Sequence, residues 1–208
     1  MASRLPGDAW TGWQVAPVSD MQPLMKVTKG VMLLIGLGLV TSSRPAAQAP
    51  TADPASASSS KFARVVLADA QSRTIGEARL QETPHGVLLR LDLRQAPPGV
   101  HALHFHNTGR CDGPTFESAG AHFAPGGHQH GFLKADGPHA GDLPNIEVPG
   151  NGQLTVEYLA RDVTLGAGPT TLFDGDGSAL VVHEGKDDYI TDPAGNAGNR
   201  IACGPLVR

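Results

Sequence analysis

The sequence predicts an all-β domain, built as a sandwich or a barrel, and three observations lead to this fold class. Short segments with partial alternation of apolar and polar residues recur after residue 60, and Gly, Pro, Asp and Asn separate them. No long stretch of this region carries a clean helical stripe of apolar side chains. Two stretches, 107–149 and 186–199, break the rhythm and are rich in Gly, Pro, Asp and His. Several short strands divided by turn residues are typical of sandwiches and barrels.

The pattern indicates five strands directly. They are expected at residues 61–68, 74–81, 86–94, 152–160 and 179–184. Each is rich in Val, Leu, Ile or aromatic residues, and each is bounded by turn-forming residues. Irregular stretches as long as the two described above are uncommon in compact domains unless they serve function. We therefore expect both to be functional loops.

The N-terminal part of the chain differs from the rest. Lys26 and Lys29 precede an apolar run over 30–40, and small residues follow at Ala47-Gln48-Ala49. This order is typical of a secretory signal peptide, and the run is shorter than the roughly 20 residues of a membrane span. We expect an upstream extension plus signal peptide over 1–49, a disordered Pro/Ser-rich linker over 50–60, and one folded domain over 61–208.

The charge of the exported part limits its partners. Four of the 16 basic and two of the 20 acidic residues precede residue 50, which leaves a net charge of −6 after it. An acidic chain without basic clusters argues against nucleic acid and anionic membranes as partners. No cysteine lies directly after the apolar run, so we expect no lipid or other membrane anchor. The protein is predicted to be periplasmic or secreted.

Both cysteines, Cys111 and Cys203, fall in the exported part. In an oxidising compartment such a pair is most simply a disulfide. Closing a loop of about ninety residues would stabilise the fold by roughly 4–5 kcal/mol in the chain-entropy account. The alternative, two metal-binding thiolates, stays open, although the many histidines make it the weaker interpretation.

The segment HALHFH, residues 101–106, contains three imidazoles. Residues two apart on a strand point to the same face, so His104 and His106 can reach one metal ion together. His101 has odd spacing from them and should point elsewhere. A His-x-His pair alone is a weak signal. It gains weight from further candidate ligands, which are His122, His128, His130, His139, Asp142 and His183.

The chemistry of these residues suits two metals. Imidazole binds copper and zinc well, and a carboxylate that joins three imidazoles suits tetrahedral zinc. His128 has no obvious role and is read as part of a surface loop. An exported copper- or zinc-binding storage or delivery protein could use the same histidines. It would not need Arg200, a shared ligand or a carboxylate that links the two sites.

In their order along the chain, five segments resemble those of the copper–zinc superoxide dismutases, and the short second loop resembles the bacterial branch. They are GVHALHFH (99–106), SAGAHFAPGGHQHG (118–131), GPHAGDLPN (137–145), LVVHEGKDD (180–188) and GNAGNRIACG (195–204). With the flanking strands the resemblance spans about residues 62–206. It implies a Greek-key β-sandwich or flattened eight-stranded barrel with two long functional loops.

The resemblance also implies the roles of single residues. Copper would bind His104, His106, His122 and His183, and zinc would bind His122, His130, His139 and Asp142. Asp187 would accept hydrogen bonds from His104 and His130 and so connect the two sites. Arg200 would lie beside copper, and Cys111 would pair with Cys203.

The implied activity is the disproportionation of two superoxide anions to oxygen and hydrogen peroxide. His122 would act as both a metal ligand and an acid. Arg200 would supply a positive field for the anionic substrate, which the net negative chain otherwise lacks. Lys134 and Lys186 are read as ordinary solvated lysines. The sequence leaves open whether the protein forms a homodimer.

Overall fold

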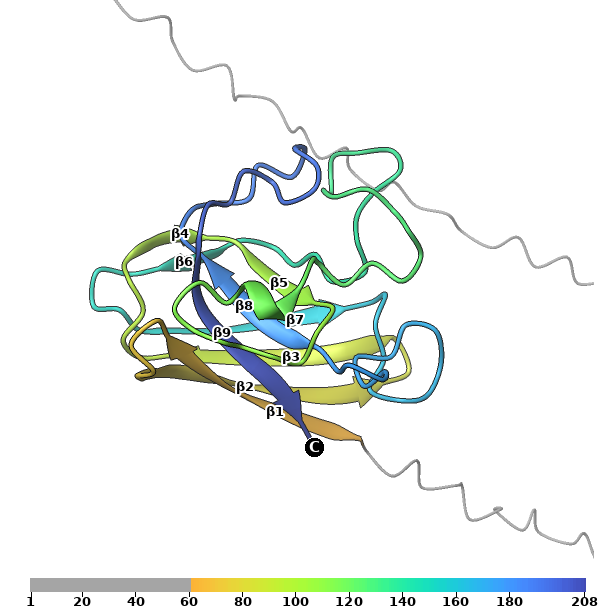
Figure 1. Cartoon of the computed structure of the whole chain (residues 1–208), viewed down its shortest axis with the longest axis horizontal. Coiled ribbons are helices and arrows are strands. Elements are labelled where there is room, and N and C mark those ends of the chain that lie inside the picture. Colours follow the sequence, from red (N-terminus) through yellow and green to blue (C-terminus); the bar gives the residue numbers. More distant parts are fainter. Residues whose placement is uncertain (1–60) are drawn as a thin grey trace, which may run out of the picture. The chain divides into compact units, whose positions relative to one another are not determined.

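The computed structural model describes residues 61–208, and this part of the chain is all β (Figure 1). The strands are β1 (Phe62–Asp69), β2 (Thr74–Thr83), β3 (Gly86–Leu93), β4 (Gly99–His101), β5 (Leu103–His106), β6 (Ile146–Val148), β7 (Leu154–Ala160), β8 (Ala179–His183) and β9 (Arg200–Val207). A single turn of 3₁₀ helix, η1, covers Glu117–Ala119. The predicted fold class is confirmed. The predicted extension, signal peptide and linker lie outside the described residues.

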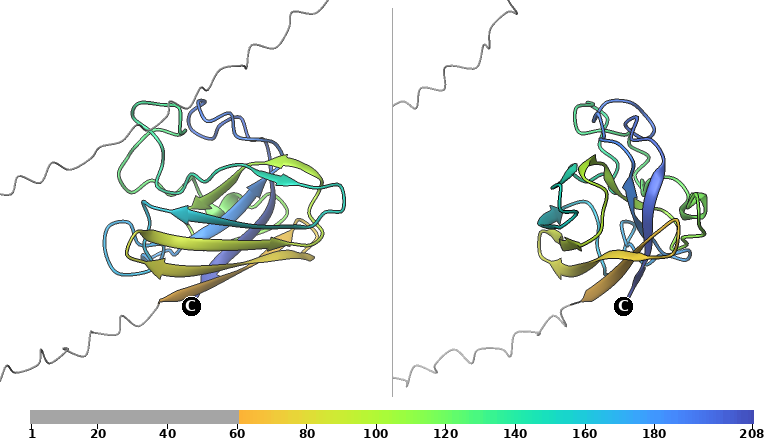
Figure 2. Two further views of the ribbon diagram at one scale, coloured as in Figure 1. Left: turned by 180° about the vertical axis from the view of Figure 1, so that it is seen from behind. Right: turned by 90° about the vertical axis from the view of Figure 1, so that its left-hand side faces the viewer.

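The strands form a curled antiparallel sheet. Seven of them follow the order β5-β8-β9-β1-β2-β3-β7, and β4 pairs with β6 in a second, two-stranded sheet. Only Ala102 separates β4 from β5, so these two segments act as one bent strand that joins the sheets. The nine segments therefore correspond to the eight strands of a flattened barrel. The side view in Figure 2 shows how the sheet wraps around its interior.

One face of the sheet forms the core because apolar and polar residues alternate along its strands. Val65 and Leu67 on β1, Leu80 on β2, and Leu89 and Leu91 on β3 are fully or almost fully buried. Several of their sequence neighbours, such as Arg79 and Arg90, are exposed and carry charge. A slip of one residue in pairing would turn this apolar set toward solvent, so the core fixes the register.

The five predicted strands correspond to β1, β2, β3, β7 and β8, with ends that agree within two residues. Strand β6 lies inside the stretch predicted to be a loop, where three residues are too short to show alternation. Strand β9 contains Gly204 and Pro205, which normally interrupt strands. A side chain at Gly204 would overlap the backbone of Val66, so glycine allows β9 to approach β1 closely.

The two predicted functional loops project from the same end of the barrel and contact each other (Figure 1). The backbone N–H of His130 donates to Asp192 Oδ1 at 2.7 Å, and that of Leu133 donates to the Tyr189 carbonyl at 3.1 Å. The predicted disulfide between Cys111 and Cys203 is present and ties the beginning of the first loop to β9. Among the described residues, no helix has the length and apolar character to cross a bilayer.

Candidate metal centre

Two neighbouring strands supply three histidines to one buried cluster. His104 and His106 lie on β5, which pairs with β8 so that they stand opposite Val181 and Ala179. His183 ends β8 two residues after Val181, and the pairing of β8 with β9 shifts register between Val182 and His183. All three histidines are buried. The predicted pairing of His104 and His106 on one side of the strand is thus confirmed.

Backbone contacts bring the long-loop residues to the same cluster. His122 forms an isolated β-bridge with His106, and Asp142 forms one with His104. Between these bridges, Phe105 donates its N–H to the carbonyl of Gly141, and its own carbonyl accepts the N–H of Phe123, the residue after His122. A Cβ at Gly141 would lie 2.5 Å from the Phe105 carbonyl oxygen. Glycine is therefore required where the loop crosses β5.

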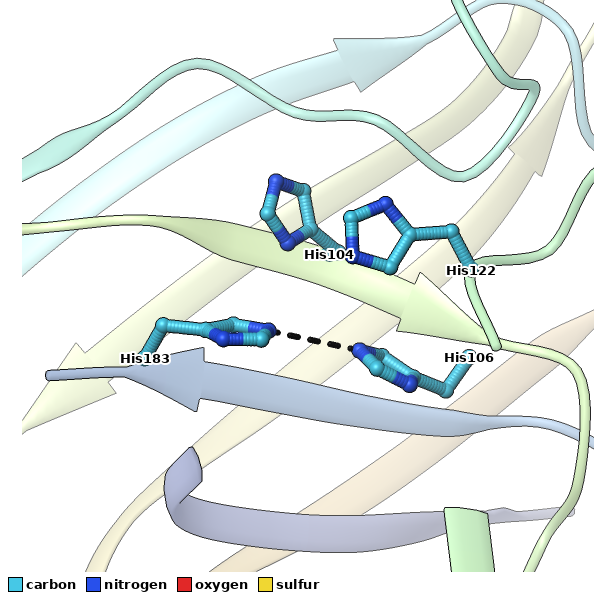
Figure 3. A group of neighbouring side chains, drawn as sticks. All are labelled: His104, His106, His122 and His183. Carbon is cyan, nitrogen blue, oxygen red and sulfur yellow. Dashed lines mark hydrogen bonds between the residues drawn. The ribbon is translucent and has the colours of Figure 1, made fainter. Parts of the chain in front are cut away.

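Four histidines form the first donor set, and they are drawn in Figure 3. Ligand atoms of His104, His106, His122 and His183 all lie within 4.8 Å of one another. The Nε2 atoms of His106 and His183 are 3.4 Å apart. Nδ1 of His104 and Nε2 of His122 are buried and have no hydrogen-bond partner among the residues that the structure describes. Such atoms are costly to bury unless something binds them, and a copper ion held by four imidazoles satisfies them.

Three histidines and a carboxylate form the second donor set. Oδ1 of Asp142 lies 3.1 Å from Nδ1 of His122, 3.1 Å from Nδ1 of His130 and 3.4 Å from Nδ1 of His139. Its other oxygen accepts the backbone N–H groups of Gly131 and His139. Four donors about 2.0 Å from a tetrahedral zinc ion would be separated by about 3.3 Å. The observed spacing fits zinc.

A ligand atom of His104 also lies within 4.8 Å of those of His122, His130 and Asp142. We assign His139 to this set because its Nδ1 is buried, lacks a hydrogen-bond partner and faces the same oxygen of Asp142 as its neighbours. His104 belongs to the first set, since its Nε2 is used in a bond to Asp187 and its Nδ1 is left without a partner.

The ring of His122 faces both donor sets. Its Nδ1 lies beside Asp142, and its unpartnered Nε2 lies on the side of His106, whose ring centroid is 4.9 Å away. The rings of His130 and His139 are 5.1 and 5.5 Å from it on the zinc side. Each nitrogen of one imidazole can therefore serve a different ion.

Hydrogen bonds on the outer side of each ring select the nitrogen that faces the metal. Asp187 accepts from Nε2 of His104 at 2.9 Å through Oδ2 and from Nε2 of His130 at 3.0 Å through Oδ1. The Nδ1 groups of His106 and His183 lie 2.9 and 3.3 Å from backbone carbonyls. Such partners fix the tautomer and orientation of metal-binding imidazoles. Asp187 connects the two donor sets, as expected.

The electrostatics of the cluster favour neutral imidazoles in the first set. Burial lowers the pKa of His104, and burial together with neighbouring positive groups lowers the pKa of His106 to about 2 and that of His183 to about 3. Burial also lowers the pKa of His122 to about 4. Only the neutral ring can donate a lone pair to a metal, so these four residues are ready to bind one at neutral pH.

The second set has a different charge balance. Burial alone would lower the pKa of His130, but its hydrogen bonds to Asp142 and Asp187 outweigh burial and raise that pKa to about 9. Burial alone would raise the pKa of both carboxyls, yet the hydrogen bonds that they accept hold each pKa below its usual value. Both carboxylates therefore remain charged.

Arg200, at the start of β9, is half-buried beside the first donor set. Its Nη1 donates to the carbonyl of Phe116 and its Nη2 to that of Gly120, both at 2.6 Å. The Gly120 carbonyl also lies 2.9 Å from Nδ1 of His106, so one peptide group positions both the guanidinium and a metal ligand. An open pocket of about 520 Å³ lies here, lined by Pro114, Thr115, Glu117, Gly198, Asn199 and Arg200.

The remaining histidines lie apart from the cluster or serve its frame. His101 has Nδ1 2.9 Å from the His183 carbonyl and Nε2 2.9 Å from the Pro97 carbonyl, so it serves a structural role and points elsewhere, as its odd spacing predicts. His85 and His128 are exposed. Sequence reasoning missed Asn145, which binds the backbone of Asp187. Its only signal was its place at the end of one family-like segment.

The fold and donor sets define a β-barrel metalloprotein whose two ions share one histidine. Comparison with known proteins agrees, because the family profile described as copper/zinc superoxide dismutase (SODC) matches residues 74–206. The chain belongs to the copper/zinc superoxide dismutase family.

Individual relatives support this assignment. The chain is 48% identical over 146 residues to "Superoxide dismutase [Cu-Zn] 2" of Aquifex aeolicus (strain VF5). The matched region covers 69% of this chain and 85% of the relative. Among solved structures, a SOD-like protein from Bacillus subtilis superposes with a TM-score of 0.67 at 37% identity, over 69% of this chain and 97% of that one. The Cu/Zn superoxide dismutase from Brucella abortus gives a TM-score of 0.58 at 25% identity, over 70% and 99% of the two chains.

Proposed function

We propose that this protein is a superoxide dismutase, which converts two superoxide anions to oxygen and hydrogen peroxide. Copper would be held by His104, His106, His122 and His183, and zinc by His122, His130, His139 and Asp142. The single observation that carries the proposal is the position of the His122 ring, with one nitrogen toward each donor set. A protein that only stored metal would have no use for a shared ligand.

Bound copper supplies one-electron reduction and oxidation, whereas zinc has no redox chemistry and organises its ligands. The residues supply the protons and the positioning. Nε2 of His122 can take up a proton when it is not bound to metal, and from there it can donate that proton to the reduced product. The contact between Asp142 and the opposite side of the ring keeps Nε2 directed at the first donor set. His122 therefore combines two roles, ligand and acid.

Arg200 is proposed to bind and orient the anionic substrate. Within residues 61–208 its hydrogen bonds go to two neutral carbonyls, so no carboxylate of this part of the chain pairs with its positive charge. The two carbonyls hold the guanidinium at the wall of the open pocket. In a net negative protein, a fixed positive group beside the reacting centre attracts an anion locally. This role distinguishes the enzyme from a copper or zinc carrier.

The test is Arg200→Ala in the metal-loaded protein. We expect the rate of superoxide consumption to fall at least tenfold while the copper content stays at the wild-type level, since Arg200 does not contribute to either donor set. Arg90→Ala removes the same charge from the outer face of β3 and should leave the rate close to wild type. A rate that survives Arg200→Ala with copper in place would overturn the role of Arg200.

We also propose export to the periplasm or to the medium. The basic-apolar-small pattern over 25–49 and the disulfide support this location. N-terminal sequencing of the protein recovered from the periplasm should begin near residue 50, and accumulation of the uncleaved chain in the cytoplasm would contradict export. Sedimentation velocity of the exported protein gives its mass in solution, and a mass twice that of the monomer would identify a homodimer.

A further inference from the structure

The two tyrosines of the sequence both bind one residue, Asn145. Tyr158, on β7, donates its hydroxyl to the Asn145 carbonyl at 2.9 Å. Tyr189, in the loop after β8, accepts the Asn145 backbone N–H at 2.7 Å. The peptide groups on both sides of this half-buried residue are thus held by phenols from two distant parts of the chain. Such convergence fixes the position of Asn145 relative to the barrel.

The side chain of Asn145 in turn holds the backbone of Asp187. Its Nδ2 donates to the Asp187 carbonyl at 2.9 Å, and its Oδ1 accepts the Asp187 N–H at 2.8 Å. These two bonds resemble a β-bridge made by a side chain. They determine where the backbone of Asp187 lies, and therefore where its carboxylate can reach. That carboxylate bonds His104 and His130, one from each donor set.

Tyr189 makes three further contacts at the same place. Its N–H donates to Oδ1 of Asp187 at 2.6 Å, and its carbonyl accepts the N–H of Leu133 from the first loop at 3.1 Å. Its ring packs edge-on against Phe132, with centroids 5.4 Å apart. Its φ is 63°, which is uncommon for a residue other than glycine. The surrounding contacts have to maintain this conformation.

We propose that Tyr158 and Tyr189 are positioning residues of the metal centre, whose hydroxyls hold Asn145 and thereby fix the Asp187 carboxylate that connects the two donor sets. They touch no ligand side chain themselves. Loss of either hydroxyl leaves a peptide group of Asn145 without its partner, so the side-chain clamp on Asp187 loosens. His130 then loses part of its orientation, and the zinc site, which depends on it, is the first to weaken.

The experiment follows metal release rather than superoxide consumption, so its outcome does not depend on the proposed activity. Cobalt(II) replaces zinc in the purified, disulfide-intact protein, and its visible absorbance reports the geometry of the site during transfer to a chelator. Replacing a group that orients a metal ligand typically changes metal affinity 10- to 100-fold. We expect Tyr189→Phe to release cobalt about tenfold faster, with an altered spectrum, and Tyr158→Phe several-fold faster.

A matched control separates this effect from the general loss of a hydroxyl. Thr155, on the same strand as Tyr158, donates its hydroxyl to Asp92 at 2.6 Å on the outer face. Thr155→Val should release cobalt at the wild-type rate. If it releases as fast as Tyr189→Phe, or if Tyr189→Phe releases at the wild-type rate with an unchanged spectrum, the proposal fails.

The double variant tests whether the two phenols act through one residue. Because both hold Asn145, Tyr158→Phe combined with Tyr189→Phe should accelerate release by less than the product of the two single effects. Full multiplication of the single effects would mean two independent contacts and would overturn the shared clamp. Phenylalanine retains both rings, including the packing against Phe132, so the variants are expected to fold.

Discussion

Gly195 lies directly against the carboxylate that connects the two donor sets, and its replacement by alanine should weaken the zinc site. The residue has a φ of 63°, in the left-handed region. A Cβ built on it would overlap Oδ1 of Asp187 and lie 2.7 Å from Nε2 of His130. Neither neighbour can move freely, because Asp187 is also bonded to His104 and Tyr189. The new methyl group must displace the carboxylate.

Gly195→Ala has two effects of similar size, and they are separated by the property in which each is measured. The left-handed conformation costs an alanine about 1–2 kcal/mol in the free energy of unfolding. Displacing the partner of a metal-binding histidine costs about 10- to 100-fold in metal affinity, equivalent to about 1.4–2.7 kcal/mol. The first effect appears in the stability of the metal-free protein, and the second is measured as a loss of zinc affinity.

Gly127→Ala isolates the backbone effect. Gly127 has a φ of 68°, and a Cβ there would meet nothing within 4 Å. Urea unfolding of the metal-free variants should therefore show the backbone loss in both, and a larger loss in Gly195→Ala, whose methyl group also displaces the Asp187 carboxylate. Competition for zinc with a chromophoric chelator should show weaker binding for Gly195→Ala alone. Equal zinc affinities for the two variants would refute the argument that Gly195 is needed to make room for Asp187.

Three further outcomes are expected. Asp142→Ala should weaken zinc at least tenfold before copper is affected, measured by stepwise chelation, since its carboxylate belongs only to the second set. Removing zinc from the wild-type protein should change the copper absorption spectrum through His122, and an unaltered spectrum would contradict a shared ring. Glu117→Gln removes a negative charge from the pocket of Arg200. It should raise kcat/KM for superoxide about twofold at low ionic strength and by less in salt. Glu147 is the exposed residue of β6, and Glu147→Gln should leave kcat/KM unchanged.

Most of the metal centre could be predicted from the sequence because strand geometry and donor chemistry limit the possibilities. The spacing of His104 and His106 places both on one side of any strand, whatever the rest of the fold does. The other ligands were predicted from the resemblance of their segments, in their order along the chain, to those of the family. Each of these ligand residues lies in the cluster. His101, at odd spacing, points instead to two carbonyls of the frame.

The supporting contacts could not be predicted in this way. The clamp of Asn145 on Asp187 joins residues 42 apart in the sequence, and that of Arg200 on Gly120 joins residues 80 apart. Neither follows from periodicity, because each depends on where an irregular loop lies in space, against the second loop for Asn145 and against β9 for Gly120. The carbonyl of Gly120 carries no signal at all, since every residue has a carbonyl. Such contacts become visible only when the loops have been placed in space.

The charges around His130 explain how the centre can stay ordered before it acquires metal. Asp142 and Asp187 are buried carboxylates, and a buried charge without a partner is strongly destabilising. Because the pKa of His130 is raised to about 9, both of its ring nitrogens carry a proton at neutral pH, and each donates to one of the two carboxylates. With zinc bound, Nδ1 of His130 would hold the ion in place of that proton, while Nε2 would keep its bond to Asp187. The same two carboxylates therefore hold the metal-free site together and orient its ligand once zinc is bound.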